Sequence, residues 1–128
     1  MEPYALSRYK HTQITTADQG KLVLMMYDGA MKFIEIAVMK LKENDIAGKG
    51  VYISKAQAVI SELMASLNTE KGGEIAVSLE KLYAFVGRQL RTANINKDIK
   101  PLEVSNRLLG TLREGWQGIF NATTVPVK

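Results

Sequence analysis

The sequence contains no cysteine and a single histidine, His11, and these two scarcities exclude most metal and redox chemistry. Without thiolates the chain forms no disulfide, no iron–sulfur cluster and no cysteine-ligated zinc site, and it has no cysteine nucleophile. One histidine alone excludes paired-histidine acid–base catalysis and histidine-rich metal centres. We therefore expect neither a cofactor nor a metal.

Long uncharged apolar runs are also missing. The most apolar stretch, residues 22–41, is interrupted by Asp28, Lys32, Glu35 and Lys40, and each charge is costly inside a lipid bilayer. The opening residues contain no apolar run of the kind that a secretion signal needs. We expect a cytoplasmic protein with no membrane insertion.

Charge of one sign is not concentrated anywhere along the chain. The 17 basic and 13 acidic side chains give a net charge of +4, and they are mixed from end to end. A protein that follows a nucleic-acid backbone needs a concentrated basic surface. The sequence therefore predicts no nucleic-acid partner.

Proline is scarce, with 3 in all, and none lies between residues 4 and 100, so no proline interrupts a helix there. Apolar residues recur every three or four positions in four successive segments, as in amphipathic helices. We expect the first helix to begin at Asp18 and the fourth at Pro101, with turns at 44–50, 68–73 and 94–100. The apolar positions are Leu22, Met26, Phe33 and Ile36, then Ile53, Ala56, Ile60, Leu63 and Leu67, then Ile75, Leu79, Leu82, Val86, Leu90 and Ala93, and finally Leu109, Leu112, Trp116 and Ile119.

Four amphipathic helices with short connections bury their apolar faces against one another. With 128 residues the chain is long enough for one domain with its own core. The predicted fold is all-α, an antiparallel four-helix bundle with a short N-terminal arm. We expect residues 1–17 to form the arm, 18–121 the bundle and 122–128 a flexible tail.

Two features indicate a protein-binding surface. The first helix is apolar almost all round, more than a bundle helix needs, and so requires additional cover. Leu6 and Tyr9 form a small apolar patch on the arm, outside the main helices. Glycines inside the predicted helices (Gly29, Gly87, Gly110, Gly115 and Gly118) fit either close helix packing or a low surface left for a partner.

Other functions remain open on these residues alone. Small helical isomerases of the chorismate-mutase type work without cysteine or histidine, and Arg88 and Arg91, three positions apart, are suited to holding a dicarboxylate. A general helical adaptor is a further alternative. Asp28, Lys32 and Glu35 lie on one helical side and are expected to form a solvated ion-pair ladder.

Several short motifs occur together in one order: Thr16–Leu22 (TADQGKL), Met26–Ala30 (MYDGA), Lys55–Gln57 (KAQ) and Glu70–Ala76 (EKGGEIA), followed by Leu82-Tyr83, Ala93-Asn94, Leu102–Val104, Leu108-Leu109 and Trp116. In this order and spacing the chain resembles the bacterial flagellin-specific export chaperones, the FliS family, from about Leu6 to Ile119. The resemblance implies a non-catalytic cytoplasmic protein that binds the disordered C-terminal region of flagellin. It further implies that the chaperone prevents premature polymerisation and presents its cargo to the cytoplasmic domain of the flagellar export gate.

The resemblance also implies where flagellin binds. The arm is expected to cover part of the binding groove and to be displaced by cargo. The expected flagellin-binding residues are Leu6 and Tyr9 of the arm and Tyr27, Tyr52, Ala56, Ile60, Tyr83, Val86, Leu90 and Asn94 of the bundle.

Overall fold

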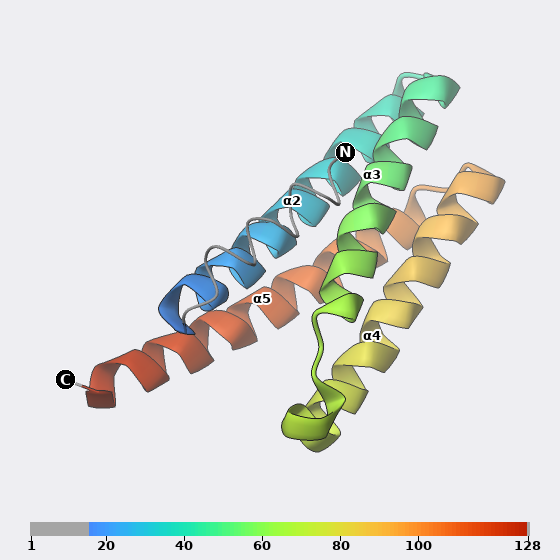
Figure 1. Cartoon of the computed structure of the whole chain (residues 1–128). Helices are drawn as coiled ribbons and strands as arrows, with labels where there is room; N and C mark the ends of the chain where they lie inside the picture. The colour runs from blue at the N-terminus through green and yellow to red at the C-terminus, as the bar shows by residue number, and fades with distance from the viewer. Residues whose placement is uncertain (1–15, 128) are drawn as a thin grey trace.

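Four helices make up the described part of the chain. The computed structural model describes the backbone of residues 16–127 and the side chains of residues 20–68 and 70–118. The helices are α2 (Thr16–Lys42), α3 (Ile46–Ala65), α4 (Thr69–Asn96) and α5 (Lys100–Val127), and residues 16–127 contain no strand (Figure 1).

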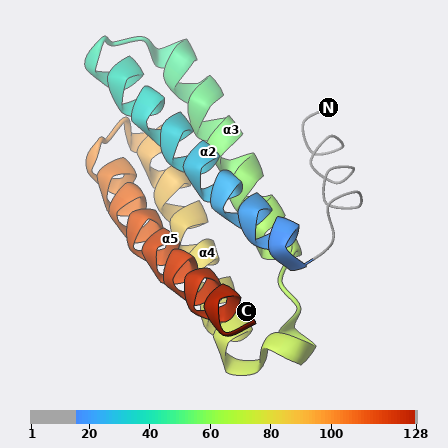
Figure 2. The ribbon, with the colours of Figure 1, turned by 90° about the vertical axis from the view of Figure 1, so that its left-hand side faces the viewer.

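The helices pack as an antiparallel ring. Each contacts the next along the chain, and α2 packs against α5 to close the ring. Figure 2 shows α2 beside α3 and α5 beside α4, with the α3–α4 connection, the start of α2 and the end of α5 at one end of the bundle. The predicted four-helix bundle is confirmed.

The connection between α2 and α3 is shorter than the predicted turn at 44–50. Asn44 takes a left-handed conformation with φ 62°, and the Asp45 N–H returns to the Lys40 carbonyl at 2.8 Å, which closes the end of α2. The Asp45 carboxylate then accepts from the Gly48 N–H at 2.9 Å and caps α3. A Cβ on Gly48 would stand 2.5 Å from the Asp45 carboxylate, so a larger residue here would force the capping side chain to shift.

The predicted break at 68–73 is a single helical turn followed by a kink. Asn68 caps that turn, since its side-chain oxygen accepts from the Lys71 N–H at 3.1 Å. Gly73 then takes φ 56° and ψ −132°, a conformation open essentially to glycine alone, before α4 continues. The kink sets the first turn of α4 at an angle to the rest of the helix.

The ends of the bundle differ from the predicted boundaries. α2 begins at Thr16, two residues before the predicted start at Asp18. The tail expected from residue 122 is instead helical to Val127, because residues 119–125 contain no glycine or proline to stop α5. Lys100 and Pro101 open α5, as predicted for Pro101, and the Asp98 carboxylate accepts from the Lys100 N–H at 3.1 Å.

One continuous core fills the ring. It draws on all four helices, and its fully buried side chains include Ile34, Ile53, Leu90 and Leu109. Close helix packing does not explain the helical glycines, because a Cβ on Gly29, Gly87, Gly115 or Gly118 would meet nothing within 4 Å. A Cβ on Gly110 would meet only the Met31 methyl group, at 3.7 Å.

Candidate protein-binding surface

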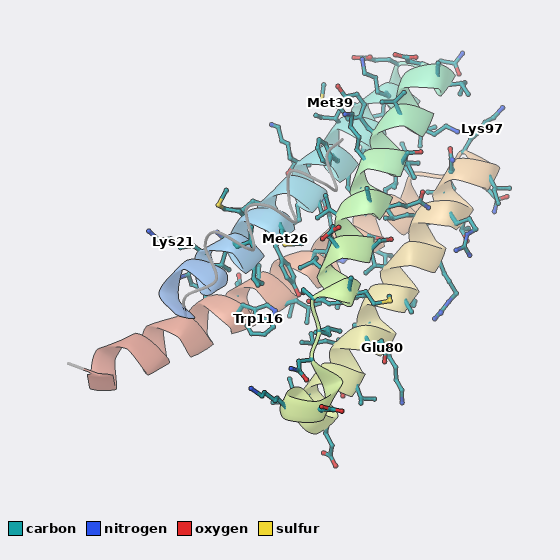
Figure 3. The ribbon with its side chains drawn as sticks, viewed as in Figure 1. Lys21, Met26, Met39, Glu80, Lys97 and Trp116 are labelled. Carbon is teal, nitrogen blue, oxygen red and sulfur yellow. The ribbon has the colours of Figure 1, made fainter. Side chains whose placement is uncertain are left out.

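An apolar cleft of about 380 Å³ opens at the end of the bundle where α2 begins. There the start of α2 and the end of α5 diverge from the end of α3 and the start of α4 (Figure 1). All four helices contribute to this end cleft, and Met26 and Trp116 mark its position in Figure 3. Its lining is Gly20, Leu22, Val23, Met26, Leu63, Ser66, Leu67, Asn68, Lys71, Gly72, Ile75, Ala76, Leu79, Tyr83 and Trp116.

The end cleft has apolar walls that reach the surface. Ile75 lies just beyond the Gly73 kink and is 68% exposed, which is costly for an isoleucine with no cover. Leu67, in the connection after α3, and Met26 of α2 line the same cleft. A partner with apolar side chains on one face therefore finds complementary surface here.

Beneath this cleft lies a buried polar cluster in an otherwise apolar core. The hydroxyl oxygens of Tyr27 and Tyr83 are 2.6 Å apart, and Trp116 Nε1 donates to the Tyr27 oxygen at 3.1 Å. Burial raises the pKa of both tyrosines above the ordinary value, so both hydroxyls stay protonated at neutral pH. The three side chains come from α2, α4 and α5 and hold those helices together below the end cleft.

Most of the predicted groove residues are core residues in this structure. Tyr27, Ala56, Val86 and Leu90 are 0% exposed, and Ile60 and Tyr83 are nearly so. Tyr83 reaches the edge of the end cleft. These expected binding residues therefore lie on the inner face of the bundle.

Tyr52 and Asn94 are half-buried, and each is engaged by a neighbour. The Tyr52 ring packs against Phe33, with centroids 6.2 Å apart. Lys49 Nζ donates to the Asn94 carbonyl at 3.0 Å and to its side-chain oxygen at 2.7 Å. Leu6 and Tyr9 lie outside the described residues.

Leu67 and Ile75 line the end cleft but were not among the binding residues expected from the sequence. Both were placed on helical stripes and so were expected to face the core. The available signal was the pair Gly72-Gly73 directly before Ile75, since a kink turns the following side chain away from its stripe.

A second cleft, of about 570 Å³, lies between α3 and α4. Arg88 and Arg91, the residues considered for a dicarboxylate site, both line it. The predicted ladder on α2 is replaced in part by a cross-helix pair, since Arg113 Nη2 donates to the Asp28 carboxylate at 3.1 Å. Among the described residues no three histidine, cysteine, aspartate or glutamate side chains are grouped to hold a metal.

The fold and the end cleft define a small helical bundle with an apolar cleft at one end. No helix within the described residues is long and apolar enough to cross a membrane. A family model described as flagellar protein FliS matches residues 2–123.

The sequences of several relatives align with most of this chain. The flagellar secretion chaperone FliS of Salmonella typhimurium is 36% identical over 107 residues, covering 83% of this chain and 79% of the relative. Those of Bacillus subtilis and Campylobacter jejuni are each 32% identical, covering 90% and 94% of this chain and 84% and 94% of the relatives. A solved structure described as a flagellar chaperone from bacteria shares the fold, with a TM-score of 0.78 at 20% identity, over 95% of this chain and 99% of that one.

The chain belongs to the FliS family of flagellar secretion chaperones. The members of this family are not enzymes, so the isomerase alternative is wrong. A general adaptor with no flagellar role is excluded in the same way.

Proposed function

We propose that this chaperone binds the disordered C-terminal region of flagellin in the cytoplasm, prevents its premature polymerisation and presents it to the cytoplasmic domain of the flagellar export gate. Membership of the FliS family supports the cargo, because the relatives are flagellar secretion chaperones. The observation that carries the proposal is the end cleft, whose apolar walls include the 68% exposed side chain of Ile75.

The physical properties of the end cleft suit a disordered partner that must later be released. An amphipathic segment that folds on binding covers a wide apolar surface but spends several kcal/mol on its own ordering. The complex is therefore specific without being irreversible. Met26 lines the end cleft and Met25 beside it is 56% exposed, and the flexible methionine side chain adapts to an irregular partner surface.

The expected binding residues divide by their accessibility. Tyr83 already borders the end cleft, and we assign it a direct contact with flagellin. Tyr27, Ala56, Val86 and Leu90 require the helices to separate before they contact cargo. Ile60 is 3% exposed and needs the same separation. The remaining proposed contacts are the half-buried Tyr52 and Asn94, and Leu6 and Tyr9 on the arm that cargo displaces.

The test is a titration of the chain with a peptide of the flagellin C-terminal region, followed by far-UV circular dichroism. We expect saturable binding and more helix in the complex than in the two free components together. The same region with its sequence scrambled is the control and is expected to add no helix. Additive spectra with no detectable complex would contradict the proposal.

Two further measurements test the remaining parts. Chaperone added to purified flagellin monomers is expected to stop filament growth at a one-to-one ratio. Replacing Leu6 and Tyr9 together by alanine is expected to change flagellin affinity and amide-exchange protection around the end cleft. Unchanged affinity and unchanged protection would show that the arm does not cover the binding surface.

A further inference from the structure

The cleft between α3 and α4 carries positive charge on one wall only. Arg88 and Arg91 stand on the α4 wall, three positions apart, so their Cβ atoms are about 5–6 Å from each other. Gln57 and Ser61 form a neutral polar wall on α3. We call this site the arginine cleft, with the lining Gln57, Ile60, Ser61, Met64, Tyr83, Ala84, Gly87, Arg88 and Arg91.

Neither arginine is neutralised by a described carboxylate. The ion pairs among the described residues are made by Lys40 and by Arg113, away from the arginine cleft. Both Arg88 and Arg91 are exposed. Two exposed arginines with no ion pair to a described carboxylate therefore line this cavity.

The fold places two stretches without any acidic residue side by side. Residues 46–61 of α3 contain Lys49 and Lys55 but no aspartate or glutamate, and residues 81–97 of α4 are likewise free of both. α3 and α4 pack directly against each other. The sequence mixes its charges along the chain, but the fold packs these acid-free stretches against each other, up to Glu62 on α3.

The nearest acidic residue before this face on α4 is Glu80. It lies eight positions before Arg88, about 12 Å along the helix axis, and Figure 3 shows it on the half of α4 opposite Lys97. At that distance water and salt screen most of its effect on an exposed arginine. On α3, Glu62 stands between the lining residues Ser61 and Met64, so the positive charge of the arginine cleft lies on its α4 wall.

We propose that the arginine cleft is a second interaction surface, which binds an acidic peptide segment of a partner protein. The two guanidinium groups pair with carboxylates, a geometry in which arginine forms two parallel hydrogen bonds. Ile60, Met64 and Ala84 line the space between the walls and accept an apolar side chain of the same segment. The two arginines lie outside the end cleft and are not among the proposed flagellin contacts, although Tyr83 lines both clefts and Ile60 is a proposed flagellin contact as well.

The lining favours a peptide over a nucleic acid. Single-stranded nucleic acids need exposed rings on which bases stack, but Tyr83 is the only aromatic residue of the lining and is 1% exposed. A neutral α3 wall also provides no second row of phosphate contacts. Carboxylates held at a peptide's regular spacing match the two arginines better.

The test is fluorescence anisotropy with a fluorescein-labelled peptide that repeats Glu-Glu-Leu, at low ionic strength. We expect saturable binding that weakens at least tenfold when Arg88→Gln and Arg91→Gln are combined. The control combines Lys32→Gln and Arg107→Gln, which removes the same charge from exposed positions on α2 and α5 and is expected to stay within twofold. Arginine Nε–H resonances provide a second readout, with shifts expected at Arg88 and Arg91 and none at Arg107.

Three results would overturn the proposal. The first is no saturable binding of the peptide. The second is an equal loss of affinity in both double variants, which would show attraction by net charge alone. The third is tighter binding of an oligothymidylate of similar length through the same two arginines, which would make the arginine cleft a phosphate site. Flagellin binding by the Arg88→Gln/Arg91→Gln variant, expected to be unchanged, keeps this test separate from that of the proposed function.

Discussion

The hydroxyl oxygens of Tyr27 and Tyr83 lie 2.6 Å apart, joining α2 to α4 across the bundle rather than between neighbours in the ring. Their rings meet edge to face, with centroids 6.3 Å apart and an interplanar angle of 64°. Trp116 of α5 adds its indole N–H to the Tyr27 oxygen. Three helices are thus fixed to one another below the end cleft by a small set of directional contacts.

Removing the Tyr27 hydroxyl tests this cluster. Tyr27→Phe removes the oxygen that the Trp116 N–H and the Tyr83 hydroxyl both contact, so we expect a loss of about 1–3 kcal/mol in the free energy of unfolding. Tyr83→Phe leaves the Trp116–Tyr27 bond in place and is expected to cost less, about 0.5–1.5 kcal/mol. Urea unfolding followed by the fluorescence of Trp116, the only tryptophan, measures both. A larger loss for Tyr83→Phe would contradict this assignment of the bonds.

The same pair predicts how stability depends on alkaline pH. Burial raises the pKa of Tyr27 and Tyr83 in the folded chain, whereas in the unfolded chain both ionise near the ordinary tyrosine pKa of 10.0. Above that pH the unfolded state has released protons that the folded state still binds, so the free energy of unfolding falls as the pH rises. We expect a shallower fall for Tyr27→Phe, measured by urea unfolding at intervals from pH 9 to 11. Parallel curves for the two proteins would show that the Tyr27 hydroxyl titrates normally.

The kink at Gly73 is the next testable feature. Gly73→Ala forces a side chain into a conformation that only glycine adopts readily, and we expect a loss of about 1–3 kcal/mol in stability. Gly115 is a matched control, because it lies exposed in α5 with open space around it. Gly115→Ala is expected to stabilise the chain by about 0.5–1 kcal/mol, since alanine is the better helix former. Equal effects of the two substitutions on thermal unfolding would contradict the role of the kink.

The sequence was sufficient to predict the bundle because apolar spacing reports a helix directly. It placed Leu63, Leu79 and Trp116 on stripes that do face the interior or the end cleft. Helix ends were less predictable, since Gly48 resembles a turn residue in sequence but serves in the first turn of α3 beside its cap. Distinguishing such a glycine requires knowing which side chain approaches it.

The binding surface was harder to predict from the sequence. Periodicity assigns Tyr27, Val86 and Leu90 to an apolar face but does not tell whether another helix of the chain or a partner covers that face. Ile75 and Leu79 lie on the same predicted stripe, but Ile75 is exposed and Leu79 is buried. The difference follows from the backbone kink at Gly73. The arginine cleft could not be predicted from the sequence either, because it forms only where α3 and α4 pack against each other.

Lys49 is a buried charge that fastens α3 to the end of α4. Its ammonium group donates to the backbone oxygen and to the side-chain oxygen of Asn94. Asn94 lies in the last turn of α4, where the backbone carbonyls have no hydrogen-bond partner within the helix. Lys49→Met leaves these acceptors without that donor, and we expect a loss of about 1–3 kcal/mol in the free energy of unfolding. Lys32→Met, at an exposed site on α2, is the control and is expected to change stability by less than about 0.5 kcal/mol. If Lys49→Met were as stable as the wild type in urea unfolding, the Lys49–Asn94 contact would not stabilise the fold.

The most direct test of flagellin binding at the end cleft compares two isoleucines of α4. Ile75 and Ile95 are 68% and 70% exposed, but only Ile75 lines the end cleft. A charge at either exposed site leaves the core intact, so both Ile75→Asp and Ile95→Asp are expected to fold. Isothermal titration with the flagellin C-terminal region is expected to show affinity at least tenfold weaker for Ile75→Asp and within twofold of wild type for Ile95→Asp. Equal affinities of the two variants would contradict binding at the end cleft.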